Sequence, residues 1–290
     1  MKKIIFFTLF LIFTNSYAQV NHPKASPFSR IEQEVGLSKI TITYSRPAVR
    51  GRQIFGDSLN GQPALVPYGR IWRVGANEST KFNVDSDIEV MGNLLPKGIY
   101  ALYAFPQEDA WEVVFHKNID HWGDGRKAYD SKEDAFRITI VPEVLANFQE
   151  NFLIMIDDID YNSANMVWLW EHTKITIPIT VDTETLMQEE IAKQLRENPT
   201  AQTYYEVARY LQEQGKEYSR ALEYLNKAIE LGGDTYYFYR VKSLIEAALE
   251  DYNGAIGSAQ KSMALAAVED KDEFVRMNQK NIYLWRKLMD

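Results

Sequence analysis

Residues Ser45–Phe82 read SRPAVRGRQIFGDSLNGQPALVPYGRIWRVGANESTKF. The stretch holds five arginines and three prolines, and regular strand or helix patterning is interrupted along its 38 residues. Long loop-rich segments inside compact domains are uncommon, and they are usually either functional or disordered. The apolar residues within the stretch argue against disorder. We therefore expect an ordered, irregular segment inside a folded domain.

Strand patterns lie on both sides of this segment. Before it, Ile40, Ile42 and Tyr44 alternate with threonines, which is typical of a half-buried strand. After it, short alternating or apolar segments are separated by turn residues: 82–84, 88–90, 99–105, 111–115, 136–140, 152–156, 166–170 and 175–179. About nine short strands at this spacing predict an antiparallel β-sandwich or jelly-roll-like domain over residues 28–181.

From Asp182 the pattern becomes helical and begins to repeat. The residues Tyr204, Val207, Leu211, Tyr218, Ala221 and Ala228 recur 34 residues later as Phe238, Val241, Ile245, Tyr252, Ala255 and Ser262. This is the period of tetratricopeptide repeats, with small residues where paired helices touch. We predict a helical, tetratricopeptide-like domain over residues 182–290. Lys242 departs from the pattern, which prefers a small residue there.

The first residues indicate the compartment. A short basic start is followed by the apolar run Ile4–Phe13 and by Ser16-Tyr17-Ala18, which is typical of a cleaved secretory signal. An uncleaved membrane anchor is the alternative, but the run is short for a span of about 20 residues. We predict a signal peptide at 1–18, a flexible polar segment at 19–27, and a secreted, periplasmic protein with no transmembrane segment after cleavage.

The charge and the missing motifs exclude several function classes. The net charge is −8 and there is no basic block, so nucleic acid is not an expected partner. The sequence has no phosphate-binding or dinucleotide fingerprint, and we predict no cofactor. No serine lies in a Gly-x-Ser-x-Gly setting, so a nucleophilic hydrolase of that type is not indicated either.

Three arginines open the irregular segment. Arg46, Arg50 and Arg52 lie within seven residues, and arginine is suited to bidentate contacts with carboxylate or phosphate. They predict a site for an anion or an acidic sugar. The alternative is that they pair with carboxylates such as Asp57 and Glu78 and hold the loop together.

The densest part of the segment is WRVGANEST at residues 72–80. An aromatic face, an amide and a carboxylate together suit a carbohydrate-like ligand. Glu78 is a weak candidate for a general base if a buried environment favours proton uptake near neutral pH; otherwise it pairs with Arg73 or Arg52 in a structural corner. The predicted ligand-binding set is Arg46, Arg50, Arg52, Tyr68, Trp72, Arg73, Asn77, Glu78 and His116.

Histidine and tryptophan give weaker signals. The histidines His22, His116, His121 and His172 are scattered, and the chain has neither cysteine nor an HExxH motif, so we predict no metal site. A site built from these histidines would require the fold to gather them. Trp168 and Trp170 share one face of a strand, where a buried core position is favoured over an exposed stacking platform.

Several of these segments together resemble a family, the secreted bacterial domain-of-unknown-function family numbered twenty-nine eleven. The matching segments are Tyr44-Ser45-Arg46-Pro47, RGRQIFG at 50–56, VPYG at 66–69, WRVGANEST at 72–80, LPKGIY at 95–100 and WLWE at 168–171. The resemblance covers roughly Ala25 to Ile179, and similar proteins often carry a tetratricopeptide-like tail. Val74 stands where a threonine is expected. The resemblance transfers no catalytic residue.

These observations favour a periplasmic binding or interaction protein of unknown ligand. In this hypothesis the sandwich presents the Arg- and Trp-rich loop to an anionic or carbohydrate-like molecule, and the helices engage a protein or peptide partner or support the sandwich. One alternative is a glycan-active hydrolase or lyase that uses Glu78. Another is a scaffold that recruits a protein through residues 183–290.

Overall fold

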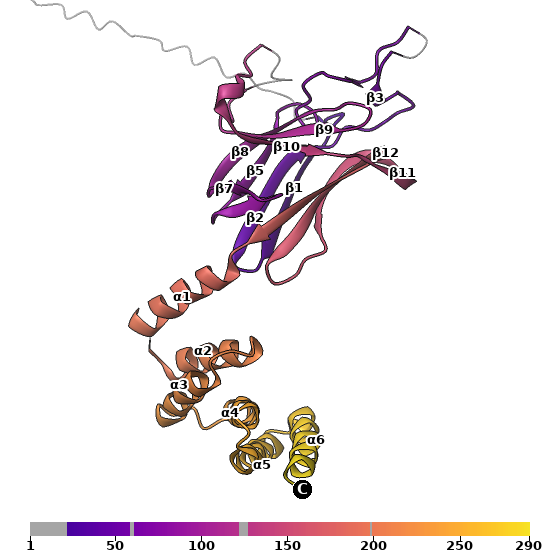
Figure 1. Ribbon diagram of the computed structural model, residues 1–290. Helices are drawn as coiled ribbons and strands as arrows, with labels where there is room; N and C mark the ends of the chain where they lie inside the picture. The colour runs from indigo at the N-terminus through magenta and orange to yellow at the C-terminus, as the bar shows by residue number, and fades with distance from the viewer. Residues whose placement is uncertain (1–21, 59–60, 122–126, 198) are drawn as a thin grey trace, which may run out of the picture. The chain divides into compact units, whose positions relative to one another are not determined.

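The chain forms a strand-rich unit followed by a helical unit (Figure 1). The computed structural model describes residues 22–58, 61–121, 127–197 and 199–290. The first compact unit ends at Thr183, and the second begins at Glu184. The predicted order of β structure followed by α structure is confirmed. The predicted signal peptide and residues 19–21 lie outside the described residues, and residues 22–27 contain neither helix nor strand.

Two antiparallel sheets build the first unit. In spatial order the larger sheet contains β1 (Phe28–Val35), β2 (Ser38–Ser45), β5 (Thr80–Val84), β8 (Gly98–Phe105), β9 (Trp111–His116) and β10 (Asp134–Ile140). The smaller sheet contains β11 (Glu143–Asp157), β12 (Ser163–Val181), β6 (Ile88–Val90) and β7 (Asn93–Leu95). In the chain, two short strands lie between β2 and β5: β3 (Phe55–Gly56) and β4 (Val66–Pro67). They pair in parallel with each other and belong to neither large sheet.

The inner faces of the two sheets share one apolar core. Alternate residues of β9, such as Val113 and Phe115, belong to the same buried cluster as Ile177 and Ile179 of β12. The period of two in each strand places these side chains on one face. Apolar burial of this kind stabilises the unit by roughly 25 cal/mol for each Å² removed from water. The predicted β-sandwich is therefore observed.

Two of the longer strands differ from the sequence prediction, and the short strands β3, β4 and β7 were not predicted either. No strand was expected at β1. Its exposed face carries Arg30, Glu32 and Glu34, and its inner face has only two aliphatic residues. It is an edge strand that pairs only with β2. The two strands expected at 166–170 and 175–179 are one strand, β12. Glu171 has a positive φ of 55°, and the register with β11 shifts around it, so an irregularity bends β12 without ending it.

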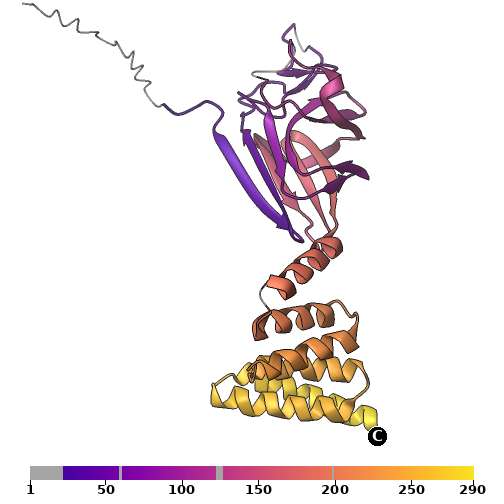
Figure 2. The ribbon, with the colours of Figure 1, turned by 90° about the vertical axis from the view of Figure 1, so that its left-hand side faces the viewer.

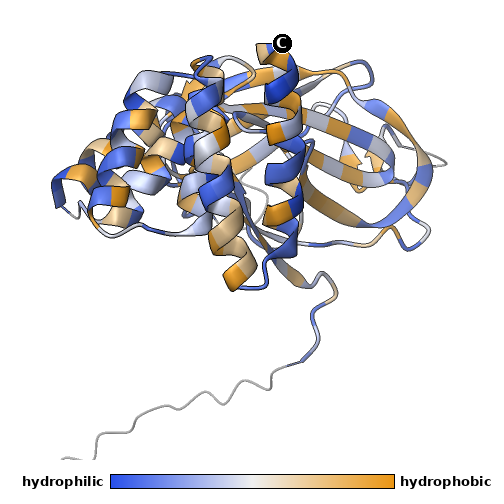
Figure 3. Ribbon diagram, turned by 90° about the horizontal axis from the view of Figure 1, so that it is seen from below, coloured by the Kyte–Doolittle hydropathy of each residue, from blue (hydrophilic) through white to orange (hydrophobic). Residues whose placement is uncertain are grey.

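The second unit is a stack of helices (Figure 2). Its elements are α1 (Thr183–Glu197), α2 (Ala201–Glu213), α3 (Tyr218–Glu230), α4 (Tyr236–Ala248), α5 (Tyr252–Val268) and α6 (Asp272–Met289). Helices α3 and α5 begin 34 residues apart, and their small residues Ala221 and Ala255 are fully buried. Figure 3 shows hydrophobic and hydrophilic residues interleaved along these helices, as expected where only one side of each helix is buried. Among the described residues, no helix combines the length and the apolar character needed to span a membrane.

Lys242 has a partner that explains its departure from the repeat pattern. Its Nζ lies 3.6 Å from Oε1 of Glu246, which is one turn further along α4 and is buried. The other carboxylate oxygen of Glu246 accepts a hydrogen bond of 2.5 Å from Ser258 of α5. The lysine therefore neutralises a carboxylate that joins two packed helices.

The substitution Glu246→Gln should change how stability depends on pH. Burial raises the pKa of Glu246, although Ser258 and Lys242 act in the opposite direction. A raised pKa in the folded state stabilises the protein at low pH, and this contribution is lost as the pH rises through the folded pKa. An amide avoids that loss while still accepting a hydrogen bond from Ser258. Relative to wild type, the melting temperature of the variant should therefore increase as the pH rises above the ordinary glutamate pKa of about 4.3.

Glu223→Gln is the matched control, because Glu223 is exposed on α3. Its melting temperature should follow wild type across the same pH range. An equal pH dependence for the Glu246→Gln variant and wild type would show that burial does not disfavour this carboxylate.

Candidate functional site

The irregular segment between β2 and β5 is anchored in the core by Trp72. This side chain is only 6% exposed and stacks on Trp170 with ring centroids 5.8 Å apart. Its backbone exchanges two hydrogen bonds of 2.8 Å with Ala104 of β8. The other rings that contact it belong to Phe55, Trp111, Phe152 and Trp168. Little of Trp72 is left for a ligand, and Trp168 and Trp170 are buried as favoured from the sequence.

A tight turn follows Trp72 directly. Val74 and Asn77 both have positive φ values, of 52° and 63°. Asparagine adopts such values readily, whereas a β-branched residue such as valine adopts them only under strain. A Cβ on Gly75 would lie 2.9 Å from the carbonyl oxygen of Ser45, so only glycine fits there. Asn77 Nδ2 donates to the carbonyl of Ser26 and to Ser45 Oγ, and it ties the turn to the start of the domain.

The three predicted arginines hold main-chain carbonyls. Arg46 Nε donates to Phe152 at 2.9 Å, and the Arg50 guanidinium donates to Ala25 at 3.2 Å. Arg52 donates to both Val49 and Ala48. These side chains do hold the loop, as the alternative interpretation expected, but these acceptors are carbonyl oxygens where carboxylates were expected. A sequence shows where an arginine lies, but it does not show which acceptor the guanidinium contacts.

Part of the predicted set lines one small pocket. Its volume is about 220 Å³, and its walls include Arg52, Trp72 and Arg73 together with the backbone of Gly75 and Ala76. Two guanidinium groups at one pocket give it a positive character. It is the place in the first unit that best fits the predicted small anionic ligand.

The remaining loop candidates lie elsewhere. Asn77 and Glu78 line a different pocket of about 160 Å³, which Lys24 and Lys81 also line. Glu78 is exposed, so the buried environment on which the hydrolase alternative depends is not observed. Burial, assisted by the carboxylates of Glu108 and Asp57, raises the pKa of the Tyr68 hydroxyl, which keeps it protonated.

His116 lies on the opposite face of the larger sheet. It is the last residue of β9, directly after the core residue Phe115, and it is fully buried, with the rings of His121 and Tyr129 against it. Its Nδ1 lies 2.9 Å from Oδ1 of Asp134, the residue opposite the end of β9 at the start of β10. Tyr129 and Arg137 donate to the same carboxylate. Burial and then the contact with Asp134 raise the pKa of Tyr129.

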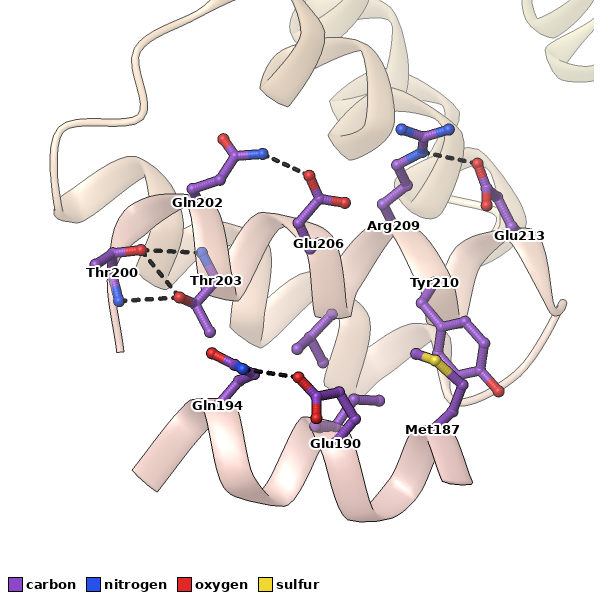
Figure 4. A pocket seen from close by; sticks show the side chains of 12 residues that line it. Met187, Glu190, Gln194, Thr200, Gln202, Thr203, Glu206, Arg209, Tyr210 and Glu213 are labelled. Atoms are coloured by element: carbon purple, nitrogen blue, oxygen red, sulfur yellow. Dashed lines mark hydrogen bonds and ion pairs between the residues drawn. The ribbon is translucent and has the colours of Figure 1, made fainter. Parts of the chain in front are cut away.

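A large pocket lies in the helical unit, between α1 and α2 (Figure 4). Its volume is about 690 Å³, within the range of about 300–1,000 Å³ typical of ligand pockets. Met187, Ile191 and Val207 give it an apolar part, whereas Glu190 and Glu206 each accept a hydrogen bond from a glutamine four residues away on the same helix. We refer to it as the α1–α2 groove.

The sequence prediction included the helices as a partner surface, and of the groove residues it named only Val207, as a repeat position. Each helix has an ordinary amphipathic pattern, with glutamate and glutamine on its polar side. Whether two such helices pack together or leave a space depends on their angle and on the connection around Thr200. The sequence does not show either.

The comparison with known families concerns the first unit. A family described as "Protein of unknown function (DUF2911)" matches residues 26–179. The chain belongs to this family. All nine predicted ligand-binding residues lie within the DUF2911 region, whereas the α1–α2 groove lies outside it. Neither a curated protein nor a solved structure matches the chain. The tetratricopeptide-like interpretation of the helices therefore stays a prediction.

Trp72→Ala should destabilise the DUF2911 domain severely. The buried indole contacts five aromatic rings. Its removal leaves a cavity, and such substitutions cost about 3–5 kcal/mol. Urea unfolding followed by tryptophan fluorescence and circular dichroism measures the change. Phe148→Ala is the control, because Phe148 is 53% exposed on β11 and its loss should alter stability only slightly. Equal stability of the two variants would contradict the anchoring role of Trp72.

Proposed function

We propose that the protein is a binding protein of the periplasm whose helical unit takes up a peptide segment in the α1–α2 groove. The observation that carries this proposal is the size of the groove together with its lining. An apolar part beside several hydrogen-bonding side chains suits a peptide, which presents alternating side chains and polar main-chain groups. The periplasmic location is supported by the leader-like pattern of residues 1–18.

The charge of the groove selects the kind of peptide. Three carboxylates line it, those of Glu190, Glu206 and Glu213, against the single guanidinium of Arg209. Arg209 donates to Glu213 at 2.8 Å, so this pair largely neutralises itself. Glu190 and Glu206 face the groove from different helices (Figure 4). We therefore expect a segment that combines basic side chains with an apolar one.

Glu206→Lys should weaken binding of a basic peptide by about tenfold, which corresponds to ~1.4 kcal/mol. Reversing one charge at the groove replaces an attraction to a lysine side chain with a repulsion. The measurement is fluorescence polarisation of a labelled peptide of alternating lysine and leucine, titrated with the full chain at low salt. A peptide of alternating glutamate and leucine should bind weakly to wild type.

Glu223→Lys is the matched control. It changes the net charge of the protein equally, but Glu223 lies on α3 and does not line the groove. Wild-type affinity is expected for this variant. If Glu206→Lys and Glu223→Lys weaken the basic peptide to the same extent, net charge alone attracts it and the groove is not its site.

A second binding function is supported by the pocket at Trp72. Arg52 and Arg73 both line it, and the glycine at position 75 brings main chain to its wall. We propose that this pocket accepts a small carboxylate or an acidic monosaccharide. Its volume of about 220 Å³ admits a ligand of that size and excludes a longer oligosaccharide.

Arg73→Gln should abolish binding of glucuronate or galacturonate at this pocket, measured by isothermal titration calorimetry on a variant that circular dichroism shows to be folded. The reason is that Arg73 is half-buried at the pocket wall and its positive charge attracts the carboxylate. Arg70→Gln removes an exposed arginine that does not line the pocket and should bind as wild type. Binding that survives in Arg73→Gln, or no binding of either acid to wild type, would contradict this second proposal.

A further inference from the structure

The segment after β9 brings two of the scattered histidines together on the outer face of the larger sheet. The rings of His116 and His121 have centroids 5.4 Å apart. The carboxylate of Glu133 lies beside them, with Oε2 at 3.5 Å from His116 Nε2. One potential ligand atom from each of these three residues lies within 4.8 Å of the other two. Two imidazoles and a carboxylate are the protein ligands of many zinc sites with an open position.

The hydrogen bond to Asp134 determines which nitrogen of His116 faces this cluster. A carboxylate only accepts hydrogen bonds, so the 2.9 Å contact with Asp134 Oδ1 places the proton of a neutral His116 on Nδ1. Nε2 then presents a lone pair. Among the described residues this fully buried atom has no hydrogen-bond partner, and neither does the buried Nδ1 of His121. A lone pair 3.5 Å from a carboxylate oxygen is repelled by it, and a cation bound between the two atoms would remove that repulsion.

The distances fit a small tetrahedral ion. Donors bound to Zn²⁺ at 2.0–2.1 Å in a tetrahedron are about 3.3 Å from one another. The 3.5 Å separation of His116 Nε2 and Glu133 Oε2 already approaches this value. The donor of His121 lies within 4.8 Å of the other two, and rotation of this half-buried side chain can adjust that separation.

Neighbouring residues hold the three groups in place, as residues hydrogen-bonded to metal ligands do in known metal sites. Asp134 orients His116. The amide of Asn118 donates to both carboxylate oxygens of Glu133. Lys81 Nζ donates to the carbonyl of Ile119 at 2.6 Å, and so fixes the backbone two residues before His121.

We propose that His116, His121 and Glu133 bind one divalent transition-metal ion of the zinc type, with solvent completing the coordination. Carboxylate and imidazole ligands favour such an ion over calcium, which takes oxygen ligands. Glu133 is 41% exposed, so the ion can enter from solvent. The site is independent of the α1–α2 groove and of the pocket at Trp72, because it uses none of their residues.

The test uses the full chain without a histidine tag, stripped with chelator and titrated with Zn²⁺ by calorimetry. One ion per chain should bind to wild type and raise its melting temperature. His121→Ala and Glu133→Gln should each weaken zinc binding by about tenfold to a hundredfold and lose most of the thermal shift. His116 is left intact in both variants, because its burial makes a substitution there a risk to folding. Circular dichroism checks that both variants are folded.

His172→Ala is the matched control. His172 is exposed on β12 of the smaller sheet, whereas the cluster lies on the larger sheet. Its zinc affinity should equal that of wild type. Cobalt substitution supplies an independent readout, because the visible spectrum of Co²⁺ reports the coordination geometry. The proposal is overturned if wild type binds no stoichiometric zinc, or if His121→Ala and Glu133→Gln bind it as tightly as wild type does.

Discussion

The aromatic contact between Trp72 and Trp170 is the constraint on which the sandwich depends. Trp170 belongs to β12 of the smaller sheet, whereas Trp72 comes from the irregular segment and is bridged to Ala104 of the larger sheet. The pair thus connects the segment to both sheets. Without it the segment would have few ladder hydrogen bonds and would be held in the core only by smaller aliphatic side chains such as Ile54 and Val74. The strained Val74 and the close approach at Gly75 follow, because the chain must turn sharply just after a fixed side chain.

The arginines have a related purpose. An irregular segment that enters a core carries carbonyl groups that no neighbouring strand satisfies, and each unsatisfied buried group is costly. Arg52 supplies donors to two such carbonyls, those of Ala48 and Val49, and Arg46 ties the segment to β11 by donating to the carbonyl of Phe152. A guanidinium can do this with several N–H groups from one side chain. The cluster of arginines that suggested an anion site is therefore explained in large part by the architecture, and only Arg52 and Arg73 also reach the pocket at Trp72.

The sequence predicted what depends on local periodicity. The period of two located most strands, and the 34-residue recurrence located the helices. It missed β1, whose edge position leaves few apolar residues to alternate, and it divided β12, where Glu171 breaks the pattern without ending the strand. It also could not place His121 beside Glu133, because this contact depends on the antiparallel register that sets Asp134 opposite His116. Contacts across strands carry no signal in one sequence.

The alternation of side chains along β9 also explains how the larger sheet carries apolar core residues on one face and polar residues on the other. Along β9, Phe115 points into the aromatic core and the next residue, His116, points to the other face of the same sheet. The core face holds the apolar rings that fix the irregular segment. The outer face holds the buried imidazole of His116 and the carboxylate of Asp134, against which the half-buried phenol of Tyr129 packs. Since a sheet separates the two sets, among the described residues the polar groups of the outer face make no contact with the aromatic rings around Trp72.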